Sequence, residues 1–188
     1  SENAYAVSRG VRLEFDEARL SMYKTNQKFV ESSHANAQSQ IDSIINEINS
    51  LKQTFVQSQN GALSTSNYAA LQIQAEEIRD AIKAQMVATD GTGTAIFQDS
   101  VNQVQIEPDL MVDSGVTFTD AFGSSGTYDA PTDSELYLNM DKFVTYLSEK
   151  AAGNTSFTYT AGTVESGLDN SFDLLTQAQQ RSGGISAQ

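Results

Sequence analysis

The chain has 188 residues with 11 Lys and Arg against 24 Asp and Glu, which gives a formal net charge of −13. It contains no Cys and one His, so the composition excludes a disulfide framework, a thiolate metal site and a His-rich zinc site. The negative charge argues against a nucleic-acid partner, and no apolar run is long enough to predict membrane insertion. The length suits one domain, or one domain with a small insertion.

The charge is unevenly distributed along the chain. Between Lys83 and Lys142 there is no base, whereas this middle segment contains ten acids. Such a shift in composition indicates a separate structural unit in the middle of the chain. If copies of the protein pack side by side, like charges would face each other, so we expect this acidic segment to point outward.

The first long segment, residues 4–59, contains no Pro and one Gly, which favours an uninterrupted helix. Its apolar side chains fall into two heptad columns whose alternating steps of three and four define one narrow seam, as in long helical bundles. At about 1.5 Å per residue an unbroken helix would span roughly 80 Å, although the polar stretch 26–40 allows a kink or break. The columns are Leu13, Leu20, Gln27, His34, Ile41, Ile48 and Phe55, and Tyr23, Val30, Ala37, Ile44 and Leu51.

A turn at Asn60-Gly61 is expected to end this helix, because both residues tolerate the left-handed conformation of a helix C-cap. Residues 64–66 (Ser-Thr-Ser) offer N-caps for a second helix that ends near Thr89. The apolar stripe of this helix is Tyr68, Leu71, Ala75, Ile78, Ile82 and Met86.

Between residue 94 and about residue 130 the spacing of apolar side chains changes to two, which predicts short strands. Turns are expected at residues 107–109 and 113–115, and a loop at residues 123–126. The expected strands contain Ala95 to Phe97, Val104 and Ile106, Leu110 and Val112, and Val116 and Phe118, and a later strand contains Phe157 and Tyr159.

Two further helices complete the expected order. Asp133 is expected to cap a helix over about residues 134–152, and a last helix is expected from near Thr163 to Gly183-Gly184. The last helix has an apolar stripe but no local partner of matching length, so we expect it to pair antiparallel with the first helix. The stripe is Val164, Leu168, Phe172, Leu175 and Ala178.

The sequence therefore predicts a mainly α protein, an elongated antiparallel helical bundle or rod with a small inserted β unit. Residues 1–93 and 161–188 would form a discontinuous rod domain. Residues 94–160 would form the inserted β unit, which carries one helix at about 134–152.

Several short motifs, in this order and spacing, resemble one known family. The motifs are Ala6-Val7-Ser8-Arg9-Gly10-Val11-Arg12-Leu13-Glu14, Gln59-Asn60-Gly61-Ala62-Leu63-Ser64, Glu77-Ile78-Arg79-Asp80, Thr89-Asp90-Gly91-Thr92-Gly93-Thr94-Ala95-Ile96-Phe97, and the segments 104–123 and 177–184. Together they resemble the hook–filament junction proteins of the bacterial flagellum, the third hook-associated protein. Flagellin has the same architecture, but the Ile-Arg-Asp helix and the Asp-Gly-x-Gly passage before Ile-Phe favour the junction protein.

The resemblance implies a flagellin D1-like rod and a mechanical role outside the cell. Its implied partners are the other hook-associated junction protein, flagellin, further copies of itself and an export chaperone. Family members begin further upstream and end with another apolar helix, and the chaperone would recognise that C-terminal segment. We therefore expect this chain to be a core fragment that lacks both terminal segments, from a protein exported through the flagellar secretion channel.

Candidate chemical sites are few. His34 falls on the seam, where a packed or partly exposed position is expected, because a metal site needs several convergent ligands. The acids Glu107, Asp109, Asp113 and Asp120 lack the residue order of a calcium loop. A solvated acidic face is the expected structure there, with adventitious cation binding as the alternative.

The glycine-rich segments also lack catalytic signatures. Gly91-Thr92-Gly93 precedes an expected strand rather than a helix, so it does not predict a phosphate-binding loop, and residues 123–126 lack the frame of a nucleophile elbow. The aromatic residues Phe15, Phe29 and Phe55 lie on a helical stripe and are expected in the core or at a subunit contact. We therefore expect no catalytic, cofactor-binding or metal-binding residue and no enzyme activity.

Three functions remain open. The resemblance favours a structural subunit that joins the flagellar hook to the filament. A flagellin-type filament subunit and a coiled-coil stalk or adhesin module are the alternatives, and a β insertion within a helical rod favours a polymer subunit over a stalk.

Overall fold

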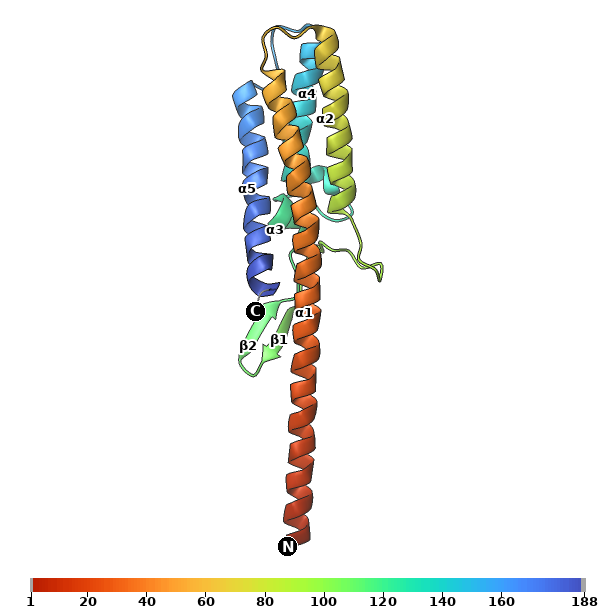
Figure 1. The fold of residues 1–188 in the computed structure, drawn as a ribbon, viewed down its shortest axis with the longest axis vertical. Coiled ribbons are helices and arrows are strands. Elements are labelled where there is room, and N and C mark those ends of the chain that lie inside the picture. The colour runs from red at the N-terminus through yellow and green to blue at the C-terminus, as the bar shows by residue number, and fades with distance from the viewer. Residues whose placement is uncertain (1, 187–188) are drawn as a thin grey trace.

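The structure, a computed structural model, describes residues 2–186 and is an elongated bundle of helices from which one helix projects (Figure 1). A two-stranded hairpin lies beside the long helix, near the middle of the molecule. The elements in chain order are α1 (Glu2–Ser58), α2 (Thr65–Met86), β1 (Gln103–Glu107), β2 (Leu110–Asp113), α3 (Phe118–Phe122), the 3₁₀ turn η1 (Pro131–Asp133), α4 (Glu135–Ala151) and α5 (Ala161–Ser186).

The first helix is continuous through the polar stretch in which a break was considered. Within that stretch the side chains of Asn26, Gln27 and His34 reach backbone carbonyl groups of the hairpin. These polar residues therefore face a partner of matching chemistry, and α1 keeps its helical hydrogen bonds throughout.

The antiparallel pairing of the first and last helices is confirmed. Helix α5 runs back along the C-terminal half of α1, and from Tyr23 onward the heptad columns of α1 are buried, except for the half-buried Gln27. Polar contacts at the edge of this seam join the same two helices: Lys52 forms an ion pair with Asp169 at 2.9 Å, and Gln179 donates a hydrogen bond to Asp42. The fully buried seam residues include Ala37, Ile41, Ile44, Ile48 and Leu51 on α1 and Val164, Leu175 and Ala178 on α5.

The helix expected within the inserted unit lies in the bundle. Helix α4 packs against α2 over most of its length and also contacts α5. Its buried side chains, among them Met140, Phe143 and Leu147, belong to the same core cluster as Ile48 and Leu51 of α1. The division into a rod (1–93 and 161–188) and an inserted unit (94–160) stays a prediction. The structure adds that residues 135–151, which were assigned to the inserted unit, share the hydrophobic core of the rod.

Only the central pair of the expected strands forms. Strands β1 and β2 are antiparallel, with Val104 opposite Val112 and an irregularity between Gln105 and Glu107. The strands expected at residues 95–97, 116–118 and 157–159 are wrong: the first is an irregular segment, the second leads into α3, and the third is a loop.

Aromatic packing explains these differences. The rings of Phe97, Phe118 and Phe122 form two edge-on pairs, each with a centroid separation of 4.8 Å, and all three side chains are fully buried. Phe157 packs against Tyr146 at 5.7 Å. Alternating apolar residues therefore anchor irregular backbone to the helices by burial, without forming a sheet.

Two helix ends differ from expectation. Ser134 rather than Asp133 caps α4, since its hydroxyl accepts a hydrogen bond from the Tyr137 amide at 3.2 Å. Helix α5 continues through Gly183 and Gly184 to Ser186, because a helix interior tolerates glycine at a modest cost in free energy when its neighbours are packed. The expected N-cap at Ser64 is confirmed and forms a capping box with Asn67.

Candidate functional site

The most unusual surface of this molecule is the N-terminal part of α1. Every residue from Glu2 to Met22 is exposed, and this stretch extends beyond the rest of the described chain as a single helix (Figure 1). Large apolar side chains are nevertheless frequent on it, with exposed fractions of 56% for Leu13, 61% for Phe15 and 60% for Leu20. An isolated helix in water gains little stability from propensity alone, so a surface of this kind is built to pack against another helix.

One part of this exposed surface continues the buried seam. Leu13 and Leu20 occupy the same heptad column as Ile41 and Ile48, which are fully buried against α5 and the bundle. The seam is therefore covered from Tyr23 onward and uncovered at Leu20 and before it, where the described chain places nothing opposite α1. This transition defines a helical packing surface that the described chain leaves unfilled.

The aromatic stripe divides in the same way. Phe55 is buried and packs edge-on against Phe143 at 5.7 Å, as expected for the core. Phe15 and Phe29 are 61% and 57% exposed, and the Arg19 guanidinium lies 5.1 Å from the Phe15 ring centroid. These two rings are therefore available for a contact between subunits, which is the second of the two roles expected for the stripe.

His34 is a packed residue on α1. It is 2% exposed, and its Nε2 lies 2.9 Å from the backbone oxygen of Asp113. Because that carbonyl oxygen can only accept, Nε2 carries the hydrogen and donates it. His34 thereby fixes the end of β2 against α1, while Asn26 and Gln27 donate to the carbonyls of Gln105 and Ile106 at 2.8 Å each. The hairpin is held by three side chains of α1.

The four acids considered as a cation site do not converge. Glu107, Asp109 and Asp113 are exposed on the hairpin, whereas Asp120 lies on α3 and faces Arg181 at 3.9 Å. Within residues 2–186 no three side chains of the metal-ligating types are close enough together to hold an ion. The expected solvated acidic face thus comprises the three hairpin acids, whereas Asp120 is half-buried and lies apart from them.

The segment Asp90 to Thr94 is a tight turn. The Asp90 carboxylate accepts hydrogen bonds from the Thr92 hydroxyl at 2.6 Å and from the amides of Thr92 and Thr94 at 2.8 and 3.1 Å. Gly93 adopts a φ of +84° and closes the turn. Hydrogen bonding by the Thr92 hydroxyl and then by the two amides lowers the pKa of Asp90, because these donors stabilise its charged form. Gly91 and Gly93 are thus part of a tight turn.

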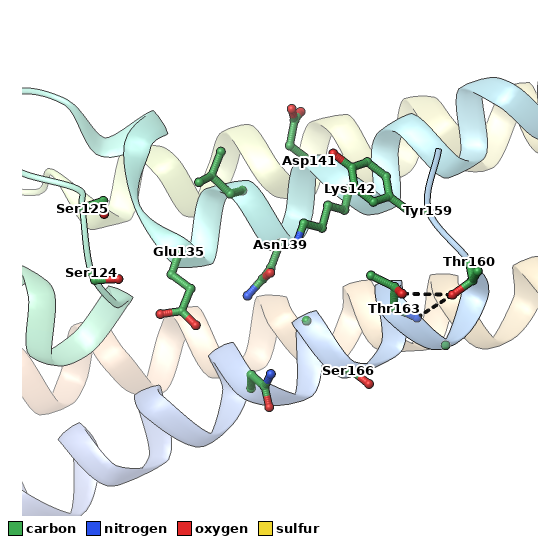
Figure 2. A pocket seen from close by; sticks show the side chains of 14 residues that line it. Ser124, Ser125, Glu135, Asn139, Asp141, Lys142, Tyr159, Thr160, Thr163 and Ser166 are labelled. Atoms are coloured by element: carbon green, nitrogen blue, oxygen red, sulfur yellow. Dashed lines mark hydrogen bonds between the residues drawn. The ribbon is translucent and has the colours of Figure 1, made fainter. Parts of the chain in front are cut away.

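A groove of about 880 Å³ lies between α4 and the start of α5. Figure 2 shows Glu135 and Asn139 extending from α4 toward α5, with Ser124 and Ser125 at one end of the groove and Tyr159 and Thr160 at the other. Its lining is mostly Ser, Thr, Asn and Gly, so it lacks both the apolar walls of a small-molecule pocket and a nucleophile paired with a base. The sequence analysis did not identify this groove, because its residues come from three separate segments.

Two charged residues near the groove are already engaged. Asp141 points away from α5 in Figure 2 and accepts a hydrogen bond from Arg79 of α2 at 2.9 Å. Burial works against the charge of Arg79, but hydrogen bonds to Asp80 and Asp141 and the nearby Tyr137 raise the pKa of its guanidinium. Lys142 lies 5.7 Å from the ring centroid of Tyr159. These contacts join α2, α4 and the loop before α5, which is a structural role.

The described helices also include none with the length and apolar character that a membrane crossing requires. The features with a clear physical purpose are the covered seam, the hairpin held on α1 and the uncovered end of α1. Together they define a rod-shaped helical subunit whose long helix presents a packing surface beyond its own bundle.

Comparison with known proteins identifies the family of this rod. Residues 1–102 match the model of the bacterial flagellin N-terminal helical region, and the chain belongs to that family. No curated protein matches the sequence.

Solved structures have the same fold. A chain from Vibrio parahaemolyticus assigned as a flagellar hook-associated protein superposes with a TM-score of 0.81 at 15% identity, over 97% of this chain and 87% of that one. Xanthomonas campestris FlgL superposes in two crystal forms at 14% identity. The TM-score is 0.69 over 90% of this chain and 91% of that one in the first form, and 0.61 over 93% and 90% in the second. These likenesses extend over nearly the whole chain and agree with the expected fold class.

Proposed function

We propose that this protein is a structural subunit of the bacterial flagellum that joins the hook to the filament within the axial structure. The observation that carries the proposal is the heptad seam of α1, which is covered by the hairpin and α5 from Tyr23 onward and open over residues 2–22. A protein that works as a separate globule has no use for about twenty exposed helical residues with an apolar stripe, whereas a polymer subunit uses them to pack on its neighbours.

The family and the structural likenesses support this assignment over a generic helical rod. The chain is a member of a flagellin family, and the similar structures include a flagellar hook-associated protein and FlgL. The proposed partners are the other hook-associated junction protein, flagellin and further copies of this chain. We also propose export through the flagellar secretion channel with the help of an export chaperone.

The role is mechanical and not catalytic. Long helices transmit load along their axis, and buried apolar contact stabilises neighbours by about 25 cal/mol per Å². Within the described chain, the groove between α4 and α5 has no arrangement of nucleophile, base and orienting group, and no cluster of metal-ligating side chains forms. The proposal therefore includes no enzyme activity, cofactor or metal.

A motility assay tests the proposal. A strain that lacks its junction protein is complemented with the full-length parent gene, and restored swimming with filaments attached to hooks is the expected result. Filament growth in a strain that lacks flagellin would instead assign the protein as a filament subunit.

Analytical ultracentrifugation distinguishes an axial subunit from the third alternative, a coiled-coil stalk or adhesin module. An axial subunit without its neighbours is expected to sediment as a monomer in dilute solution, because each contact between copies is weak alone. A stable trimer in dilute solution would favour a coiled-coil stalk module.

A further inference from the structure

The uncovered part of α1 has a second apolar face besides the one that continues the seam. Val11, Phe15, Ala18, Met22 and Phe29 follow one another in steps of four, three, four and seven, which places them along one side of the helix. The four large members are 46% to 61% exposed. This second face differs from the column of Leu13 and Leu20 that leads to the α5 contact, so extending the α1–α5 pairing would leave it uncovered.

Two arginines lie along one flank of this face, with Asp16 between them in the sequence. Arg12 and Arg19 are seven residues apart on α1, next to the apolar side chains, and the Arg19 guanidinium already lies over the Phe15 ring. Residues 1–28 contain five bases and four acids, a formal charge of +1. Residues 29–188 therefore carry −14, so the first part of α1 is far less acidic on average than the rest of the chain.

The β1–β2 hairpin has the complementary character. Its apolar side chains Leu110 and Met111 are 39% and 53% exposed, beside the exposed carboxylates of Glu107, Asp109 and Asp113. None of these three carboxylates forms an ion pair with a base of residues 2–186. Because Asn26, Gln27 and His34 hold the hairpin to its own α1, it is presented as a fixed surface and loses little entropy on binding.

We propose that the hairpin of one copy docks on the Val11–Phe29 face of α1 of a second copy, with Glu107 and Asp109 opposite Arg12 and Arg19. The inference rests on the proposed function in that it assumes copies that pack side by side. Copies at the same level would set acidic hairpin against acidic hairpin. A shift along the rod brings unlike charges together and removes that repulsion.

The required shift follows from helix geometry. Gln27 lies at the level of the hairpin, where it binds the Ile106 carbonyl, and Phe15 lies twelve residues before it. At 1.5 Å per residue this separation is about 18 Å. Neighbouring copies are therefore offset along the rod by roughly 20 Å, and the contact is between two different surfaces. A contact of this type propagates into an open helical array and does not close as a dimer.

Cysteine cross-linking tests the contact directly, because the chain contains no cysteine of its own. Phe15→Cys and Met111→Cys variants of the full chain are mixed at high concentration with a short bismaleimide, and adducts are read by mass spectrometry. We expect the mixed pair to cross-link at least fivefold faster than Glu17→Cys with Met111→Cys. Glu17 is exposed on the same helix but lies off the apolar face, so it is a matched control.

Charge reversal provides the second arm. Arg12→Glu with Arg19→Glu should reduce the cross-linking rate to that of the control pair, and Glu107→Lys with Asp109→Lys in the second copy should restore it. All four side chains are exposed, so circular dichroism should show the same helix content for each variant. Cross-linking that ignores these charges would overturn the proposal, as would a dominant Phe15→Cys homodimer, which would indicate pairing of two helices.

The cross-linking result can be told apart from the result of the motility test of the proposed function. If the parent gene restores motility while the Cys pair fails to cross-link, the docking geometry is wrong and the flagellar role stands. If the charge-dependent cross-link forms but complementation fails, the docking contact stands and the proposed flagellar role is wrong.

Discussion

The imidazole of His34 donates a hydrogen bond to the backbone oxygen of Asp113, at 2.9 Å between Nε2 and the oxygen. This contact joins positions 79 residues apart in the chain and connects the end of the hairpin to the long helix. The chain has no other histidine, and this one is 2% exposed. The hydrogen bond thereby helps to fix the height of the hairpin along the rod.

Replacing this histidine should loosen the hairpin. In His34→Ala the Asp113 carbonyl loses its donor and a cavity forms on α1, so we expect the free energy of unfolding to fall by about 2 kcal/mol. Hydrogen exchange should accelerate at hairpin amides, such as that of Ser114, which donates to the Asn102 carbonyl. The amides of α4 in the same protein are the internal control, and equal acceleration there would mean that the whole bundle has been weakened.

Two residues on the same helix test the boundary of the covered seam. Ile44→Ala removes a fully buried side chain and should lower the free energy of unfolding by about 2–5 kcal/mol. Leu13→Ala, at a position that is 56% exposed, should change it by less than about 0.5 kcal/mol. Urea unfolding followed by circular dichroism measures both, and similar losses would contradict an uncovered N-terminal helix.

Substituting Gly126 and Gly10 by alanine should have opposite effects on stability, because only Gly126 is closely surrounded. A Cβ on Gly126 would lie 2.6 Å from the Cα of Ser134, so Gly126→Ala must displace the residue that caps α4. We expect a loss of about 1–3 kcal/mol in the free energy of unfolding. Gly10→Ala meets nothing within 4 Å and lies inside a helix, so it should raise helix stability by up to about 1 kcal/mol. Thermal unfolding of both variants checks the two signs.

The turn at Asp90 should respond to acid. Hydrogen bonds in the folded state lower the pKa of this carboxyl group, so their contribution is present at neutral pH and is lost as the pH falls through the folded-state pKa. Carbon NMR of the side chain should give a midpoint below that of an ordinary aspartate, with the Thr92 and Thr94 amides shifting at the same pH. In Thr92→Val the hydroxyl donor is gone, so the midpoint should move up. An unchanged midpoint would exclude the hydroxyl as the main cause.

The ion pair of Arg79 and Asp141 connects α2 to α4 at 2.9 Å. The Arg79 side chain is 17% exposed and that of Asp141 is 46% exposed, so water screens the attraction. A double-mutant cycle with Arg79→Met and Asp141→Asn should give a coupling energy of about 0.5–1 kcal/mol from urea unfolding. A value near zero would mean that the ion pair adds nothing to the apolar packing of α2 against α4.

Much of this fold could be predicted from the amino-acid sequence, because helical periodicity is a local property of the chain. The heptad columns that contain Ile41, Ile44 and Ile48 predicted α1, and the stripe of Leu168 and Leu175 predicted its antiparallel partner, as found. The same periodicity was uninformative about strands. Apolar residues such as Phe97 and Phe118 recur in this segment because they are anchored in a core, and burial alone does not distinguish a strand from an irregular segment.

Only the tertiary structure decided which parts of these periodic surfaces are covered. Leu20 and Ile41 occupy equivalent heptad positions, yet one is 60% exposed and the other is fully buried, since exposure depends on what lies opposite each residue. The groove between α4 and α5 and the three contacts that hold the hairpin likewise join residues far apart in the chain. Local sequence determines which way a side chain points on its helix, whereas long-range packing determines what it meets there.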